Sequence, residues 1–173
     1  MAVGIDVGST NTKVVALAGE GAVVARASRP TRRAGGDLAI DAVDLVAAIE
    51  DMVVEVCAGG RELHALCVAG IGEDGVLVDA ELTPVTPALP WFDPRRQDEF
   101  RRIRPDLHGD DTFDVDTDPV RSLVGWRWAR AQPGADRAAA WIALTDLPSV
   151  LWTGRPFLSD TLAPRTAAWR RDN

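Results

Sequence analysis

Lysine is almost missing from this sequence of 173 residues, because Lys13 is the only one and arginine supplies the other basic side chains. No apolar run reaches the ~18 residues that a membrane-spanning helix needs. The N-terminus also lacks the charged start, long apolar core and cleavage site of a signal peptide. We therefore expect a cytoplasmic protein with no membrane partner.

Cysteine is scarce too, since the sequence has only Cys57 and Cys67, and their spacing fits neither a metal site nor a redox motif. The apolar residues around them predict core thiols, with Cys57 on a helix face and Cys67 in a buried strand. The net charge of −7 argues against a general nucleic-acid-binding protein. Arginines of residues 95–104 and 121–137 are mixed with acids, which is typical of solvated helix faces.

Two nucleotide-binding motifs, GxGxxG and GxxxxGK[ST], are absent from the sequence, so a dinucleotide-binding fold is not expected. The histidines, His64 and His108, have no constellation of metal-ligating or catalytic residues around them, and we expect both to be structural or exposed. With 46% hydrophobic and 26% charged residues the chain has the composition of a globular protein. Its length fits one medium domain or two very small ones.

The pattern of apolar residues predicts the order of the elements. Three strands, over residues 2–8, 12–19 and 21–30, are separated by short turns that contain glycine. A helix over residues 40–60 follows, capped by Asp41 and ended by Gly59–Gly60. Its apolar face is formed by Leu45, Ile49, Met52, Val53 and Val56. The order β-β-β-α-β, completed by a buried strand over residues 63–72, predicts an α/β fold with a mixed sheet.

The second half of the chain gives a less regular pattern. It predicts a strand over residues 75–82, an extended proline-rich segment over 82–96, and helices over 95–104, 119–131 and 138–152. The last of these helices is interrupted near Pro148. We find no internal repeat and no low-complexity segment.

The turn between the first two predicted strands is polar. Its residues are Gly8, Ser9, Thr10, Asn11, Thr12 and Lys13. Backbone N–H groups, hydroxyls and one ammonium in a tight turn are suited to bind a phosphate. Asp6, which ends the first strand, would repel that phosphate unless a cation such as Mg²⁺ lay between them. The alternative is an ordinary hairpin, in which Asp6 and Ser9 form hydrogen bonds within their own turn.

The same stretch, GIDVGSTNTKVVAL, resembles the first phosphate motif of the actin-like ATPase superfamily. The resemblance implies a ribonuclease-H-like, actin-like domain that binds ATP and Mg²⁺. It also implies that Asp6 organises the metal and that the turn surrounds the β- and γ-phosphates. This motif is shared by sugar kinases, acetate kinases, chaperone ATPases and activator ATPases.

Three later segments resemble the FGGY carbohydrate kinases. VAGIGEDGVLVDAELTPVTPALPWFDPRR carries the W-x-D-x-R motif through Trp91, Asp93 and Arg95. AAAWIALTDLPSVLWTGR and SDTLAPRTAAW are similar to later segments of that family, the first of them through Asp146 and Leu147. With the N-terminal motif, these matches extend from residue 3 to about residue 169. They imply a kinase that transfers the γ-phosphoryl group of ATP to a hydroxyl of a sugar or polyol.

By this resemblance, the substrate would be bound by Gly72, Glu73, Trp91, Asp93 and Arg95. Each of these residues has a simpler alternative role. Glu73 could be an exposed loop acid, Trp91 could be part of the core, and Asp93 and Arg95 could form a structural ion pair. The family uses the segment that begins at Asp160 structurally.

Several positions depart from the family pattern and leave the sugar open. Ile71 and Gly72 stand where many members have a polar or bulky pair, and Leu45 and Val46 replace aromatic residues. Asp160 and Thr166 are one residue closer together than in the family motif. The hydroxyl that is phosphorylated is also open, and a homodimer is compatible with the sequence.

The family's catalytic aspartate and its second, nucleotide-binding domain would lie beyond Asn173. We therefore interpret residues 1–173 as the N-terminal portion of the first kinase domain, with no catalytic residue and no activity of its own. Two alternatives remain, namely a stand-alone binding or regulatory module derived from a sugar kinase, and an activator-type ATPase of the same superfamily.

Overall fold

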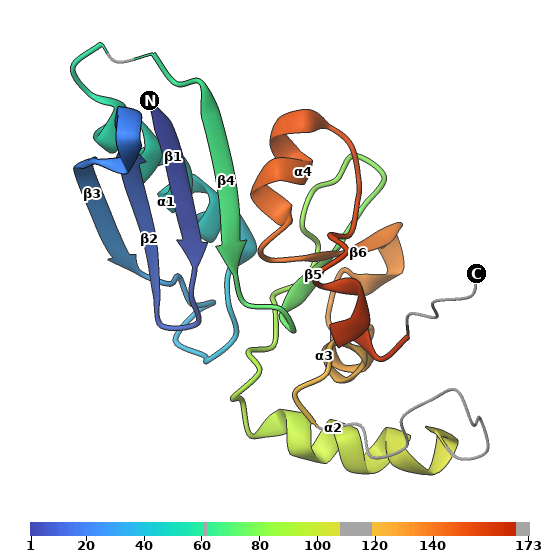
Figure 1. Cartoon of the computed structure of the whole chain (residues 1–173). Coiled ribbons are helices and arrows are strands. Elements are labelled where there is room, and N and C mark those ends of the chain that lie inside the picture. Colours follow the sequence, from blue (N-terminus) through green and yellow to red (C-terminus); the bar gives the residue numbers. More distant parts are fainter. Residues whose placement is uncertain (61, 108–118, 169–173) are drawn as a thin grey trace.

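A four-stranded mixed sheet forms one side of the molecule in the computed structural model, which describes residues 1–60, 62–107 and 119–168 (Figure 1). The strands are β1 (Ala2–Val7), β2 (Asn11–Leu17), β3 (Val23–Pro30) and β4 (Ala65–Gly70), in the spatial order β3-β2-β1-β4. Strand β1 is antiparallel to β2 and parallel to β4. The predicted mixed sheet and the order of its elements are confirmed.

Helix α1 (Ala42–Cys57) packs on one face of this sheet, in the position that the sequence predicts. The side chain of Asp41 caps it by accepting a hydrogen bond of 3.0 Å from the backbone N–H of Asp44. Leu45, Ile49, Met52 and Val56 are buried against the sheet, and Val53 is partly buried. The opposite face of the sheet remains open to solvent at Asp6 and Lys13.

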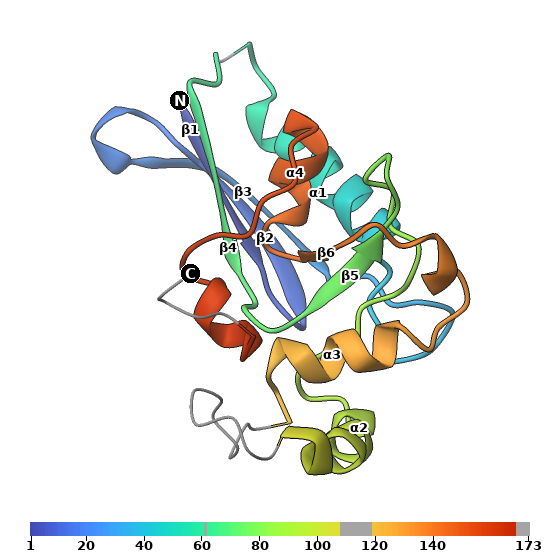
Figure 2. The same ribbon diagram turned by 90° about the vertical axis from the view of Figure 1, so that its right-hand side faces the viewer.

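A second, two-stranded sheet lies beside the first and consists of β5 (Gly75–Val78) and β6 (Ala140–Ala143). One of its faces, with Val76, Val78 and Ile142, joins the core formed by β1, α1 and helix α4 (Leu147–Thr153). The other face, with Leu77 and Trp141, packs with helix α3 (Ser122–Ala129), as Figure 2 shows. This small sheet therefore separates two hydrophobic clusters.

The remaining elements are helical and lie on the side of α3. Helix α2 (Arg95–Ile103) packs against α3 through Phe100, Ile103 and Val124. The short 3₁₀ segments are η1 (Gly19–Gly21), η2 (Arg104–Leu107), η3 (Ala135–Arg137) and η4 (Ala163–Thr166). None of the helices in the described ranges is long and apolar enough to cross a membrane.

The predicted helix over residues 138–152 is wrong in its first half, because residues 140–143 form strand β6. The run is apolar throughout, so its periodicity could not distinguish a strand with two buried faces from a buried helix. The predicted strand over 75–82 ends at Val78, where Asp79 begins a turn by accepting hydrogen bonds from the N–H groups of Glu81 and Thr83.

The predicted burial of Cys67 is also wrong. Strand β4 has a paired neighbour, β1, on one side only among the described residues, and its outer face leaves Cys67 exposed. Cys57 is partly buried against the main core, in agreement with its predicted place on a helix face. The His64 side chain is exposed and lies 2.8 Å from the N-terminal amine, whereas His108 lies outside the described residues.

Candidate functional site

The first part of the site is the turn between β1 and β2. Asp6 and Lys13 face each other across the two strands, and the Lys13 Nζ lies 3.7 Å from Asp6 Oδ2. Both side chains are more than half exposed, at 53% for Asp6 and 58% for Lys13. A carboxylate and an ammonium group are therefore presented together on the open face of the sheet, at the carboxyl end of β1.

The segment that follows β3 holds this turn in place. The Thr31 hydroxyl donates to the carbonyl oxygen of Gly8 over 2.6 Å, and the Thr31 N–H donates to the carbonyl oxygen of Thr10 over 2.9 Å. The Arg33 guanidinium donates to the intervening carbonyl oxygen of Ser9. Three successive carbonyl groups of the turn are thus bound by the protein, which fixes the turn before any ligand arrives.

The turn also depends on glycine at position 8, because a Cβ there would lie 2.4 Å from the carbonyl oxygen of Asn11. The Thr12 side chain points into the core, where it is 1% exposed and its hydroxyl lies 3.1 Å from that of Thr31. The predicted phosphate contact from the Thr12 hydroxyl is therefore not available in this arrangement. The side chains of residues 9–11 remain at the surface.

The second part of the site is the loop that follows β4. Because β1 and β4 are parallel neighbours, this loop begins at the same edge of the sheet as the turn between β1 and β2. The contact is close, since the Ile71 N–H donates to the Val7 carbonyl oxygen over 3.0 Å. A Cβ at Gly70, whose φ is +150°, would lie 2.3 Å from that same oxygen. The sheet therefore brings Gly72 and Glu73 to the edge that holds Asp6.

Glu73 is buried in this loop, with a side chain that is 9% exposed, and its carboxylate is paired with the guanidinium of Arg165. The alternative role as an exposed loop acid is wrong. Gly72 leaves the room for this pair, because a Cβ there would lie 2.8 Å from Cδ and Nε of Arg165. The sequence did not single out Arg165, although this residue lies in SDTLAPRTAAW, one of the segments that resemble the family.

A cavity of about 330 Å³ adjoins this ion pair. Its wall includes Gly70 and Gly72 from the end of β4 and the loop, together with Thr145, Ser159 and Arg165. The Thr145 hydroxyl donates to the carbonyl oxygen of Ile71 over 2.6 Å, which joins the loop to the end of β6. The volume is sufficient for a small polar molecule, and its wall offers hydroxyl, guanidinium and backbone groups.

Asp146 fixes the segment that carries Arg165. Its carboxylate, buried at the start of α4, accepts hydrogen bonds from the N–H group of Ser159 over 2.9 Å and from the Ser159 hydroxyl. The neighbouring Asp160 is exposed. The segment after α4 is therefore tied back to the core at Ser159, six positions before Arg165.

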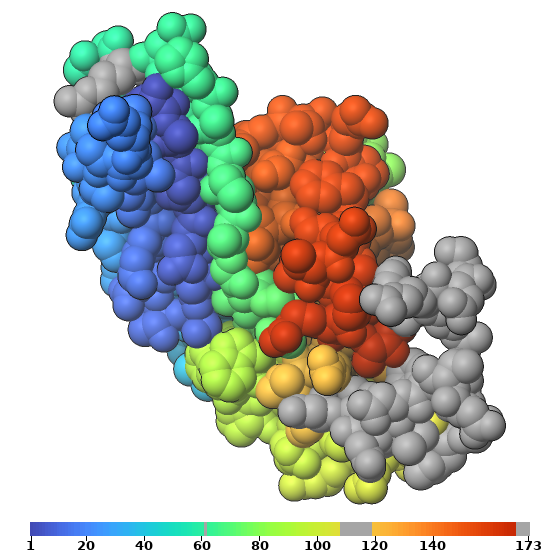
Figure 3. Space-filling model, viewed as in Figure 1, coloured from blue at the N-terminus to red at the C-terminus, as the bar shows by residue number. Residues whose placement is uncertain are grey.

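The third part of the site is the W-x-D-x-R segment. The Trp91 ring is 44% exposed and packs edge-on against Phe92, with 5.7 Å between the ring centroids. Arg33, which binds the turn at Ser9, lies over the Phe92 ring at 5.5 Å. The alternative of plain core packing for Trp91 is wrong. Figure 3 shows this yellow-green segment on the surface beside the blue hairpin.

Asp93 and Arg95 form the structural ion pair that was the alternative to substrate binding. Asp93 is 2% exposed and accepts hydrogen bonds from the Arg95 backbone and side chain, at 2.6 to 2.9 Å. Arg95 also binds Asp37 and lies 5.3 Å over the Trp128 ring. Burial alone would raise the pKa of Asp93, but the hydrogen bonds from Arg95 outweigh it and lower that pKa. These two side chains hold the segment rather than face the cavity.

The neighbouring Arg96 is buried, which contradicts the prediction that the arginines of residues 95–104 lie on a solvated helix face. Its guanidinium pairs with Asp74 at 3.0 Å, and both side chains are at most 1% exposed. It also donates to the carbonyl oxygens of Leu89, Pro90 and Arg121 over 2.7 to 3.0 Å. Arg96 thereby joins the β4–β5 loop, the proline-rich segment and the start of α3.

Asp74 is the most strongly perturbed acid of the site. Burial raises its pKa from 3.8 to about 7, Arg96 opposes that rise, and the charge of Glu73 adds to it. One oxygen of the carboxylate, Oδ2, is buried without a hydrogen-bond partner in the described part of the chain. Burial also lowers the pKa of Arg96. The ion pair between Asp74 and Arg96 is therefore a buried structural contact immediately after Glu73 in the chain.

The sheet topology, the fixed polar turn and the adjoining polar cavity are those expected of an actin-like domain. The comparison with known sequences then assigns its family. The N-terminal domain of the FGGY family of carbohydrate kinases matches residues 1–125, so the chain belongs to that family.

Individual relatives agree with this assignment. A xylulose kinase from Streptomyces coelicolor is 30% identical over 151 residues, which is 83% of this chain and 31% of the relative. The crystal structure of xylulose kinase from Rhodospirillum rubrum matches 95% of this chain and 36% of its own chain, with a TM-score of 0.80 and 22% identity. Plasmodium falciparum glycerol kinase with ADP matches 87% of this chain and 34% of its own, with a TM-score of 0.66 and 14% identity.

These likenesses confirm the predicted fold, and the chain spans about a third of the length of the relatives it matches.

Proposed function

We propose that the complete protein transfers the γ-phosphoryl group of ATP to a hydroxyl of a sugar or polyol, and that residues 1–173 form the N-terminal portion of its first domain. Membership of the FGGY carbohydrate kinases supports this function. The protein would act in the cytoplasm, and this portion by itself would be inactive. The acid that activates the accepting hydroxyl and most of the nucleotide site would come from the rest of the protein.

The observation that carries the proposal is the shared sheet edge. The turn with Asp6 and Lys13 follows β1, and the loop with Gly72 and Glu73 follows its parallel neighbour β4. Phosphoryl transfer requires that a phosphate and an accepting hydroxyl are held side by side. Two binding elements at the carboxyl ends of adjacent parallel strands meet that requirement.

On the phosphate side, Lys13 and the backbone of residues 8–11 would contact phosphate oxygens. Asp6 fits a Mg²⁺ ion that keeps most of its water, because it is a single exposed carboxylate at the edge. The described residues contain no cluster of three His, Cys, Asp or Glu side chains that could form an all-protein cage. When bound, Mg²⁺ would neutralise charge on the phosphates.

On the sugar side, Glu73 would accept hydrogen bonds from hydroxyls, and its pair with Arg165 would fix the direction of its carboxylate. The exposed ring of Trp91 would cover an apolar C–H face of the substrate. Gly72 would leave the wall of the cavity open. Asp93 and Arg95 would hold Trp91 in position without touching the substrate.

Two of the relatives named above are xylulose kinases, so we propose a five-carbon keto sugar as the first substrate to test. The test is a coupled ADP-release assay with xylulose, glycerol and gluconate. The 173-residue chain should give no turnover above an Asp6→Ala, Lys13→Ala control. Turnover by this chain above that control would contradict the proposal that the rest of the protein supplies essential parts of the active site. A longer protein that hydrolyses ATP but phosphorylates none of the sugars would contradict the proposed function.

A further inference from the structure

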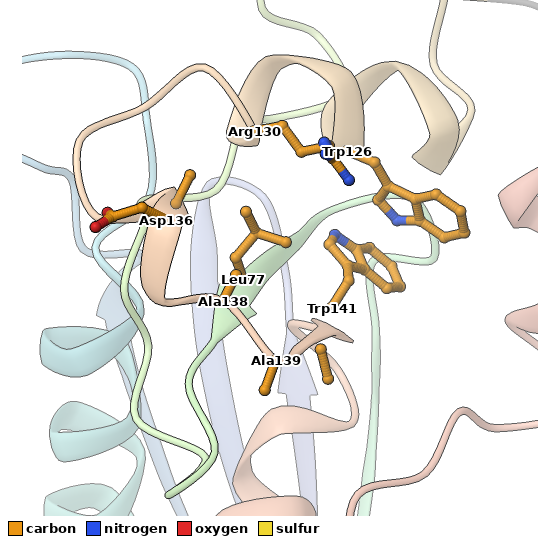
Figure 4. A pocket seen from close by; sticks show the side chains of 9 residues that line it. Leu77, Trp126, Arg130, Asp136, Ala138, Ala139 and Trp141 are labelled. Carbon is orange, nitrogen blue, oxygen red and sulfur yellow. The ribbon is translucent and has the colours of Figure 1, made fainter.

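A second and larger cavity, of about 680 Å³, lies away from the sheet edge described above. It opens beside β5 and β6, on the face of the small sheet that is turned away from the main core. Leu77 forms its apolar wall, and Trp126 and Trp141 close one end (Figure 4). Its size falls in the range of about 300–1,000 Å³ that small-molecule sites usually have.

The two tryptophans give this cavity unused hydrogen-bonding groups. Their rings are tilted by 60° with 5.2 Å between the centroids. Both indole Nε1 atoms are buried, and neither has a hydrogen-bond partner in the described part of the chain. A buried N–H group without an acceptor is unfavourable, because it has lost its hydrogen bond to water and gained none in return. A ligand oxygen that accepts from these groups would remove that cost.

A glycine at position 75 leaves space for the ring of Trp141. A Cβ at Gly75 would lie 2.2 Å from the Trp141 ring and 2.5 Å from the carbonyl oxygen of Ile142. Gly75 pairs with Ala143 and is the residue of β5 over which the indole is placed. The ring of Trp141 therefore occupies a prepared position at the wall of the cavity.

The polar groups around the cavity set the charge of its ligand. Arg130, just after α3, and Asp136, in η3, both line it. No ion pair of either side chain is formed within residues 1–60, 62–107 and 119–168. In Figure 4 the guanidinium of Arg130 lies on the side to which the indole nitrogens of Trp126 and Trp141 point. Three donors thus lie on one side of the cavity, with the exposed guanidinium of Arg130 in front and the two buried indole N–H groups in the wall behind it.

We propose that this cavity binds a small organic carboxylate with a flat apolar body. The carboxylate meets the guanidinium of Arg130 and the two indole N–H groups, which are all donors. The apolar body lies against Leu77 and the faces of the two indole rings. A single guanidinium with Asp136 in the same wall favours a monoanion over the doubly charged phosphate.

The test uses benzoate as the probe and the indole N–H signals of the ¹⁵N-labelled chain in NMR spectra. The Trp126→Phe and Trp141→Phe variants assign the two signals. Benzoate should shift both of them in a saturable way. Arg130→Gln should weaken that binding about tenfold, because a charge-assisted hydrogen bond is lost. Arg127→Gln, at an exposed position on α3, should leave the affinity unchanged.

Benzyl alcohol and inorganic phosphate complete the experiment on the unaltered chain, so the result does not depend on the folding of a variant. The proposal predicts that both bind at least tenfold more weakly than benzoate. It is overturned if benzoate moves neither indole signal at millimolar concentration. It is equally overturned if benzyl alcohol or phosphate binds as tightly as benzoate, or if Arg127→Gln weakens binding as much as Arg130→Gln.

Discussion

The carboxylate of Glu73 is paired with the guanidinium of Arg165, 92 positions later in the chain. The acid is nearly buried while the base is half exposed, and Arg165 lines one wall of the smaller cavity. This relationship ties the loop after β4 to the segment after α4. Because the two segments form one site, changes in either should affect the other.

Removal of Arg165 alone should lower the free energy of unfolding more than removal of the charges of both Arg165 and Glu73. Arg165→Met leaves the buried Glu73 carboxylate without its partner, and we expect a loss of about 1–2 kcal/mol in the free energy of unfolding. Glu73→Gln in the same chain should restore part of that loss, since the uncompensated charge is gone. Urea denaturation measures both values. Arg155→Met, at an exposed position, is the control, and an equal loss there would contradict the role of the pair.

Gly72→Ala should destabilise the chain through Arg165. The added Cβ would lie 2.8 Å from Cδ and Nε of that flexible side chain, so the arginine must move and the ion pair weakens. We expect a loss of about 1 kcal/mol in the unaltered background and almost none when Arg165 is already Met. Gly19→Ala, where a Cβ meets no atom within 4 Å, is the matched control. Equal losses in the two backgrounds would show that the backbone, and not Arg165, sets the cost.

Asp74 should make the stability of the chain depend on pH. Its pKa is about 7 in the folded chain and 3.8 without burial, so the folded state holds an extra proton between these values. The contribution of Asp74 to the free energy of unfolding should therefore be largest below about pH 4 and fall as the pH rises toward 7, by at most about 1.4 kcal/mol per pH unit.

Urea denaturation at pH 5 and pH 8 measures this dependence. Asp74→Asn should remove the part of the fall that is due to this carboxyl, because the amide does not titrate. Asp51→Asn, at an exposed position on α1, should leave the fall unchanged. If the free energy of unfolding falls equally between pH 5 and pH 8 in Asp74→Asn, another titrating group causes the fall.

Lys13→Ala should separate activity from folding. The Lys13–Asp6 pair is exposed, so its loss should change the free energy of unfolding by less than about 1 kcal/mol. In the complete kinase the same variant should reduce ADP release at least tenfold, because Lys13 would contact the phosphates. Arg26→Ala, at an exposed position on β3, provides a second basic residue for comparison. A large loss of stability in Lys13→Ala would mean that the lysine is structural.

The sequence predicted the parts of the fold and site that depend on neighbouring residues. The turn of residues 8–13 and the Asp41 cap are local patterns, and both are present. The Arg165–Glu73 pair could not be predicted by spacing, because it joins segments that only the folded chain brings together. A family motif was its only signal in the sequence.

Burial was harder to predict than secondary structure. Arg95 and Arg96 are adjacent, yet Arg95 is partly exposed and Arg96 is buried beside Asp74. The helix that begins there sends successive side chains in different directions, and the charge pattern alone does not say which direction faces the core. The burial of Cys67 was predicted wrongly for a related reason, since the sequence of an apolar strand does not show whether one or both of its faces are covered.

The measurement that tests the central claim most directly is ADP release with a sugar panel, made on the 173-residue chain and on the protein encoded when the reading frame is followed beyond Asn173. We predict that only the longer protein turns over a sugar, and that Asp6→Ala abolishes this turnover while the protein stays folded. Turnover by the 173-residue chain, or a longer protein whose activity does not change in Asp6→Ala, would contradict the account.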